Sequence, residues 1–195
     1  SGTSSVGNSG MVLIGSGVAT GGRGGSIEIA VGSGTSGSGG YIRIQSGLPT
    51  ADSALGGAVL VEGGSYVSVS GGKSALSTGG AITLASGEGT GTSSGSIKVR
   101  TSNAGTTGVS GMLVFSSGTS SVGNSGMVLI GSGAATVGRG GSIAVTVGSG
   151  TSGSGGYVRV QSGRSTIHTG GALTIESGEG TGTSSGSIKV RTSNA

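Results

Sequence analysis

The sequence has no cysteine and no tryptophan, and it has only one proline and one phenylalanine. Without cysteine the chain can form neither disulfides nor thiolate metal sites, and it offers no thiol chemistry. With so few bulky side chains in 195 residues, it cannot fill the core of an ordinary globular domain. Collagen is also excluded, because proline is nearly absent and no strict Gly-X-Y triplet runs through the chain.

Charged residues and long apolar runs are scarce as well. Charged residues make up 8% of the chain, and the cations behind its net charge of +4 are scattered, so we expect no nucleic-acid partner. No apolar run approaches the ~18 residues of a membrane helix, so no membrane span is expected. Disorder fits poorly, because the apolar residues gather in short alternating runs that need a partner surface.

Glycine is abundant, with 50 residues, and it is arranged with a period. A Gly-Gly or Ser-Gly pair precedes each apolar alternation, and we call the second glycine of each pair the marker glycine. Most marker glycines follow one another at a spacing of fifteen positions, and repeats in this size range indicate stacked supersecondary units. The marker glycines are Gly10, Gly25, Gly40, Gly57, Gly80, Gly95, Gly111, Gly126, Gly141, Gly156, Gly171 and Gly186.

Apolar residues alternate in a fixed register after each marker glycine. The second and fourth residues are apolar in all twelve units, whereas the first, third and fifth carry Ser, Glu, Arg, Lys, Thr, Gln, Tyr and others. This period of two is typical of a strand with one buried face. We therefore predict an all-β fold, a parallel β-solenoid (β-helix-like) with rungs of about 15 residues in a thin, flattened, two-faced coil. The two apolar columns should be buried, so a lysine replacing Ile130 should be severe.

A longer repeat is superimposed on this short unit. Residues 1–17 recur without change as 117–133, and residues 86–104 recur as 177–195. In a stack each residue would sit about 4.7 Å from its counterpart, so a change of size in one unit would strain both neighbours. Repetition of this kind therefore indicates that the copies pack on one another.

The long repeats suggest how the chain is organised. We predict a single continuous solenoid over 1–195 with about twelve rungs, divided into a first long repeat at 1–116 and a second, shorter and incomplete repeat at 117–195. The first repeat contains an extra rung or insertion at about 47–79, either a bulged rung or a small external hairpin. Neither end carries a polar cap, so we expect the sequence to be a window of a longer array.

Several short motifs look like chemistry but are better explained as corner turns. "GSGTSG" begins at Gly32 and Gly148, and "GTSSG" begins at Gly91 and Gly182, yet none is followed by the amphipathic helix that its mechanism requires. The only histidine, His168, has no counterpart in the first long repeat. We therefore predict that the protein is not an enzyme and has no catalytic residues, no cofactor and no metal site.

One outward-facing feature does point to a binding role. Six apolar side chains fall at first and third positions, which otherwise point to solvent, and four of them come from adjacent units. Contiguous exposed apolar surface usually marks a contact site, although a covering loop is an alternative. The predicted self-association patch consists of Met11, Leu13, Met112, Val114, Met127 and Leu129.

The repeat units themselves resemble a known class of protein. "GGSIEIAVGSGTSGSGGYIRIQSG" and "GGALTIESGEGTGTSSGSIKVRTSNA" are similar to the Gly/Ser/Thr-rich β-solenoid repeats of algal, diatom- or stramenopile-like cell surfaces and extracellular fibres. The resemblance implies an extracellular or cell-surface structural protein that builds a filament or fibre. The expected partners are other copies of itself, as a homopolymer or bundled fibre, with cell-wall polysaccharide as a further contact. An adhesin stalk or a ligand- or ice-binding solenoid surface is the alternative.

Overall fold

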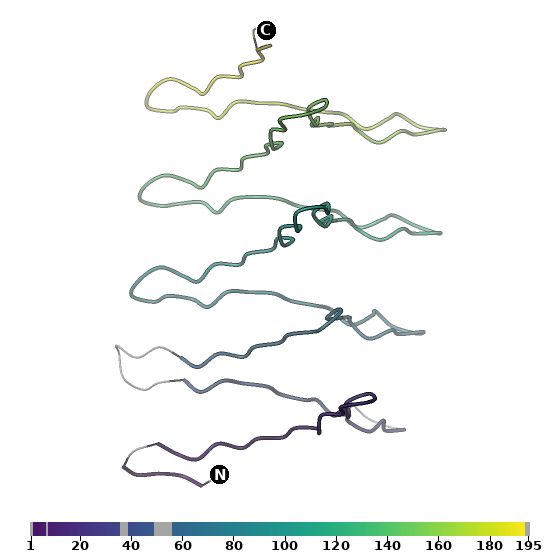
Figure 1. Cartoon of the computed structure of the whole chain (residues 1–195). Coiled ribbons are helices and arrows are strands. Elements are labelled where there is room, and N and C mark those ends of the chain that lie inside the picture. The colour runs from purple at the N-terminus through teal and green to yellow at the C-terminus, as the bar shows by residue number, and fades with distance from the viewer. Residues whose placement is uncertain (1, 7, 36–38, 49–55, 194–195) are drawn as a thin grey trace. The chain divides into compact units, whose positions relative to one another are not determined.

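The computed structural model of the chain describes residues 2–6, 8–35, 39–48 and 56–193. Within these ranges no residue lies in a helix or a strand. Figure 1 accordingly draws the backbone as a plain trace in which open stretches alternate with bends. The fold in the described ranges is therefore irregular and rich in coil.

Two units divide the chain, Ser1–Ile97 and Lys98–Ala195. Each unit is a succession of similar loops. The long repeats 1–116 and 117–195 are defined by identical sequence, whereas the two units are defined by contacts between residues. The boundary between the long repeats lies inside the second unit, so the two divisions do not coincide.

Bends recur along the chain with the period of the sequence. In the second half the first positions of successive bends are separated by fifteen or sixteen, as the spacing of the marker glycines predicts. Between bends the chain runs through the apolar alternations that follow the marker glycines. From residue 75 onward the bends comprise 75–77, 90–92, 106–107, 121–123, 136–138, 151–153, 166–168 and 181–183.

The two arms of a bend meet at the marker glycine. In seven bends the backbone N–H of the marker glycine donates to the carbonyl oxygen of a glycine eight or ten positions earlier, with N–O distances of 2.8–3.4 Å. We call this closure the neck of the bend. The donor and acceptor pairs are Gly25 with Gly17, Gly57 with Gly47, Gly80 with Gly72, Gly95 with Gly87, Gly141 with Gly133, Gly171 with Gly163, and Gly186 with Gly178.

Serine side chains add to the neck in both long repeats. The hydroxyl of Ser16 donates to the carbonyl oxygen of Gly25 at 2.8 Å, and that of Ser132 donates to the carbonyl oxygen of Gly141 at 3.0 Å. A Cβ added at Gly141 would lie 2.9 Å from the Cβ of Ser132, closer than real Cβ contacts. At Gly141 the two arms therefore approach too closely for a side chain, whereas a Cβ at Gly126 or Gly186 would make only ordinary contacts at 3.5 Å.

The predicted parallel β-solenoid is wrong for the described residues, because they contain no strand. A parallel ladder requires backbone bonds between equivalent positions of successive units, which in this sequence means a separation of about one full period. The neck bonds instead join residues eight or ten positions apart within one bend. The backbone groups thus close local loops, and the alternation of apolar residues does not develop into a sheet.

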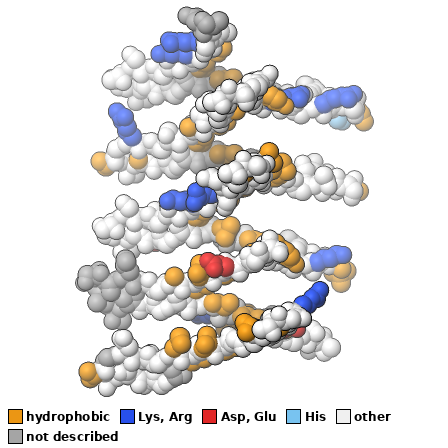
Figure 2. Space-filling model, in the orientation of Figure 1, with side chains coloured by type: hydrophobic (Ala, Val, Ile, Leu, Met, Phe, Trp, Pro, Cys, Tyr) orange, Lys and Arg blue, Asp and Glu red, His pale blue; other side chains and the backbone are white. Residues whose placement is uncertain are grey.

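The predicted burial of the apolar columns is also wrong. Among the described residues no side chain is buried, and every large hydrophobic side chain is at least 47% exposed. Figure 2 shows these side chains, in orange, on the surface of the visible face. Ile130 is 74% exposed, so a lysine there would meet water and not a dry core. Alternation determines which side chains share a side of the chain, but in the described residues no other segment covers them.

The predicted insertion at 47–79 is described only in part, because residues 49–55 lie outside the described ranges. The remainder contains bends at 64–65 and 75–77 and no strand. The choice between a bulged rung and an external hairpin stays open. Among the described residues no helix is long and apolar enough to span a membrane.

Candidate self-association surface

The predicted patch divides between the two units. Met112, Val114, Met127 and Leu129 belong to Lys98–Ala195, and all four are exposed. Met11 and Leu13 are exposed in Ser1–Ile97. They belong to the segment 11–14, whose sequence is identical to that of 127–130. The candidate surface is therefore built from 112–115 and 127–130, with 11–14 as a separate copy.

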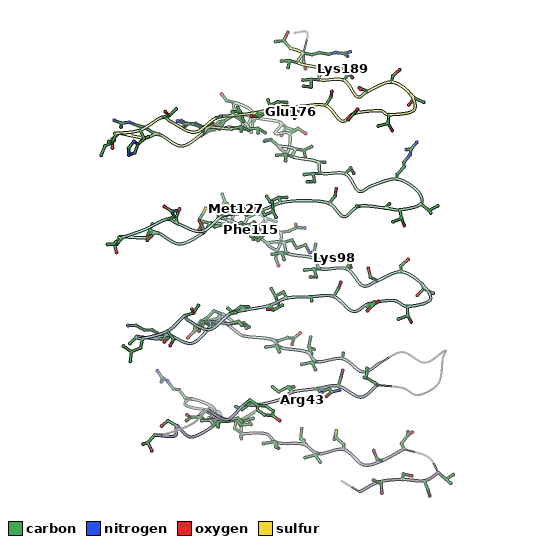
Figure 3. All side chains as sticks on the ribbon, turned by 180° about the vertical axis from the view of Figure 1, so that it is seen from behind. Arg43, Lys98, Phe115, Met127, Glu176 and Lys189 are labelled. Atoms are coloured by element: carbon green, nitrogen blue, oxygen red, sulfur yellow. The ribbon has the colours of Figure 1, made fainter. Side chains whose placement is uncertain are left out.

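A hollow of about 380 Å³ joins the two segments of the second unit. It is lined by Phe115, Val128, Leu129 and Ile130, so side chains from two successive repeats lie around one space. Figure 3 labels Phe115 and Met127, which mark the end of one segment and the start of the other. We call the hollow and the two segments together the apolar face.

The sequence pattern predicted that Phe115, Val128 and Ile130 are buried. All three are exposed, so the pattern did not identify them as surface residues. A signal for their exposure was present in the sequence. The segments read "MLVF" and "MVLI", so four consecutive residues are apolar and neither side of the chain has a polar face. Alternation is a poor guide to burial in such a run, because apolar side chains point both ways.

Residual alternation is visible in the degree of exposure. Val128, at the second position, is 52% exposed, whereas its neighbour Met127 is 81% exposed. The alternation does not extend to the next two positions, because Val114 at the third position is less exposed than Phe115 at the fourth. The first-position methionines are among the most exposed side chains of the two segments, so another molecule would meet them first.

The residues that imitate catalytic motifs take part in bends. The N–H groups of Ile167 and His168 donate to the hydroxyl of Ser165, at 3.4 and 2.8 Å. This serine caps the bend at 166–168, as serine commonly does in turns. In the described ranges no three His, Asp or Glu residues gather in a way that could hold a metal ion. The prediction that the protein is not an enzyme stays a prediction.

Comparison of the chain with protein-family models, with curated proteins and with solved structures finds no match. Functional inference therefore rests on the residues and on their geometry.

Proposed function

We propose that this protein is a structural repeat protein that self-associates into an extracellular filament or cell-surface fibre, with the apolar face as a contact between copies. The extracellular setting follows from the resemblance of the repeats to those of algal surface proteins. Self-association is proposed on the physical properties of the single chain.

The observation that carries the proposal is the exposed area. The chain exposes 19566 Å², whereas a compact protein of 17.9 kDa would expose about 8000 Å² and its extended chain about 26000 Å². Its mean hydropathy is nevertheless positive, at +0.21. Apolar side chains in water favour any arrangement that removes them from it, at roughly 25 cal/mol per Å². A chain that exposes every large hydrophobic side chain of its described residues has a strong tendency to associate.

A second copy of the chain is the partner that fits best. The apolar alternation recurs once in every repeat unit, and a second copy has the same spacing, so many contacts can form in one register. The two copies of "MVLI" at 11–14 and 127–130 give each chain two equivalent apolar segments. Two contact segments per chain allow a line of molecules to grow instead of stopping at a pair.

The test is a double substitution on the apolar face, Val114→Glu with Leu129→Glu. Both side chains are exposed, so the charges enter water in the single chain but would be desolvated between copies. We expect sedimentation velocity to show assemblies for the unchanged protein and at least a tenfold higher concentration threshold for the variant. Electron microscopy of the unchanged protein should show filaments.

The matched control is Val122→Glu with Val137→Glu. These valines lie at the bends 121–123 and 136–138 and are also exposed, so the change in charge is the same but falls outside the segments 112–115 and 127–130 and outside the lining of the hollow. The control should assemble almost as the unchanged protein does. Equal dispersal by both double variants would reject the apolar face as the contact, and a protein that stays monomeric at millimolar concentration would reject the function.

A further inference from the structure

The second unit carries a strip of outward polar and aromatic side chains outside the apolar face. Tyr157, Arg159 and Gln161 alternate with two valines. The guanidinium Nη2 of Arg159 donates to Oε1 of Gln161, so side chains two positions apart lie on the same side of the chain. Tyr157 precedes Arg159 by the same step and is 83% exposed. We call these three residues the Tyr-Arg-Gln strip.

The chemistry of the strip suits a sugar that carries an acid group. The face of a tyrosine ring is apolar and electron-rich, and it can stack on the C–H face of a pyranose ring. A guanidinium has five N–H donors in a planar fork, and the bond to Gln161 uses one of them, which leaves four for a ligand. Two residues of extended chain span about 7 Å, so the ring and the cation can contact one sugar or two adjacent ones.

The charge of the second unit favours an anionic ligand. Residues 98–195 contain seven Lys and Arg residues against two Glu, a net charge of +5, whereas residues 1–97 contain three against four acidic residues, a net charge of −1. A positive unit raises the local concentration of polyanions and speeds their association. The strip thus lies in the half of the chain that attracts acidic polymers.

The first long repeat contains the same strip as Tyr41, Arg43 and Gln45, all exposed. Figure 3 labels Arg43. Between the two copies the intervening residues change from isoleucine to valine, while the three strip residues are identical. The first strip has the same three side chains but lies in the unit with a net charge of −1, so the second strip should bind an anionic polymer more tightly.

We propose that the Tyr-Arg-Gln strips bind an acidic polysaccharide, in which the tyrosine stacks on a pyranose ring and the arginine pairs with its carboxylate or sulfate. This binding is a further activity and does not require the chain to assemble. Carboxylated and sulfated sugars share the recognised chemistry, an anionic group beside an apolar ring face.

The test measures binding of the full chain, below its assembly threshold, to polygalacturonate, to dextran sulfate and to neutral dextran by isothermal titration calorimetry. We expect binding to at least one acidic polymer and none to neutral dextran. Affinity should fall as salt is raised from 50 to 500 mM, because ions screen the exposed arginines. The acidic polymer that binds identifies the anionic group. Equal binding to neutral dextran, or no binding to either acidic polymer, would overturn the proposal.

Variants separate specific recognition from general attraction. Arg43→Gln with Arg159→Gln should weaken binding about tenfold or more, since both strips lose a charge-assisted bond. The control, Arg100→Gln with Arg191→Gln, removes the same charge at exposed sites where lysine and not tyrosine precedes the arginine, and should weaken binding less than threefold.

A second pair tests the ring itself. Tyr41→Leu with Tyr157→Leu keeps the charge and the apolar bulk, and it should weaken binding several-fold because the aromatic platform is lost. If both arginine pairs weaken the affinity equally, or if the tyrosine pair does not weaken it, binding is general electrostatic attraction. Either result would overturn the proposal that the strips bind the polymer. Sedimentation of the same variants reports assembly separately, so failure of binding leaves the proposed filament function unaffected.

Discussion

At the scale of the residue, several marker glycines are explained by the close approach of the chain to a residue nine positions earlier. Identical sequences repeat this contact closely. A Cβ at Gly40 would lie 2.7 Å from Cγ1 of Val31, and a Cβ at Gly156 would lie 2.7 Å from Cγ1 of Val147. The adjacent Gly39 has open space where a Cβ would stand. Abundant glycine is therefore not uniform filler, because particular positions require it and their neighbours do not.

Replacing Gly80 by alanine should open one neck. The added Cβ would lie 2.7 Å from the backbone nitrogen of Gly72, which cannot move aside as a side chain can. The backbone bond from Gly80 to Gly72, 2.8 Å long, should be lost. One hydrogen bond is worth about 1 kcal/mol, so hydrogen exchange of the amide of residue 80 should become about fivefold faster, as NMR can measure.

The matched control for this experiment is alanine at the other end of the same bond. A Cβ at Gly72 would meet nothing within 4 Å, so Gly72→Ala should leave the amide of Gly80 as slow to exchange as before. If the amide of residue 80 exchanges equally faster in both variants, general flexibility of the chain, and not the close approach at Gly80, determines the stability of the neck.

At the scale of the element, the bends are built in two ways. Gly123, Gly138 and Gly153 end successive bends with positive φ values of 104°, 116° and 84°, a conformation that side chains disfavour. In the next repeat unit the equivalent position is His168, and no described residue other than glycine has positive φ. That bend is capped by the hydroxyl of Ser165 instead. A regular period therefore contains bends with different local requirements.

Replacing Gly138 by alanine should disrupt the bend at 136–138. A side chain at a φ of 116° costs about 1–2 kcal/mol, so the population of this bend should fall about tenfold. Backbone chemical shifts and the φ-dependent scalar coupling of residue 138 should report the change. Gly131→Ala, at a site with open space and no positive φ, should leave the bend intact. A Gly138→Ala variant with unchanged shifts would contradict the account.

At the scale of the whole molecule, the decisive quantity is surface. With no buried side chain among the described residues, hydrophobic stabilisation must come from contacts that the single chain does not make. Contact between copies would supply these contacts, and its thermodynamic signature can be measured.

Assembly should strengthen on warming. Apolar association weakens on cooling, so sedimentation velocity at 5 and 30 °C should show larger assemblies at the higher temperature. Sulfate should strengthen assembly further, and sodium chloride should not dissolve it. Assemblies that shrink on warming and dissolve in sodium chloride would indicate that charge, and not the apolar face, holds the copies together.

The sequence by itself determined the repeat period, the marker glycines and the positions of most bends, because these depend on residues close to one another along the chain. It also proposed a patch of six residues, but their exposure does not distinguish them, because every large hydrophobic side chain of the described residues is exposed. Only the tertiary structure decided whether the alternating apolar segments form strands and whether their side chains are buried. A strand needs a neighbouring backbone that offers N–H and C=O groups in register, and a buried column needs a second layer above it. Neither condition is local, so Ile130 and Phe115, which read as core in the sequence, line an open hollow in the structure.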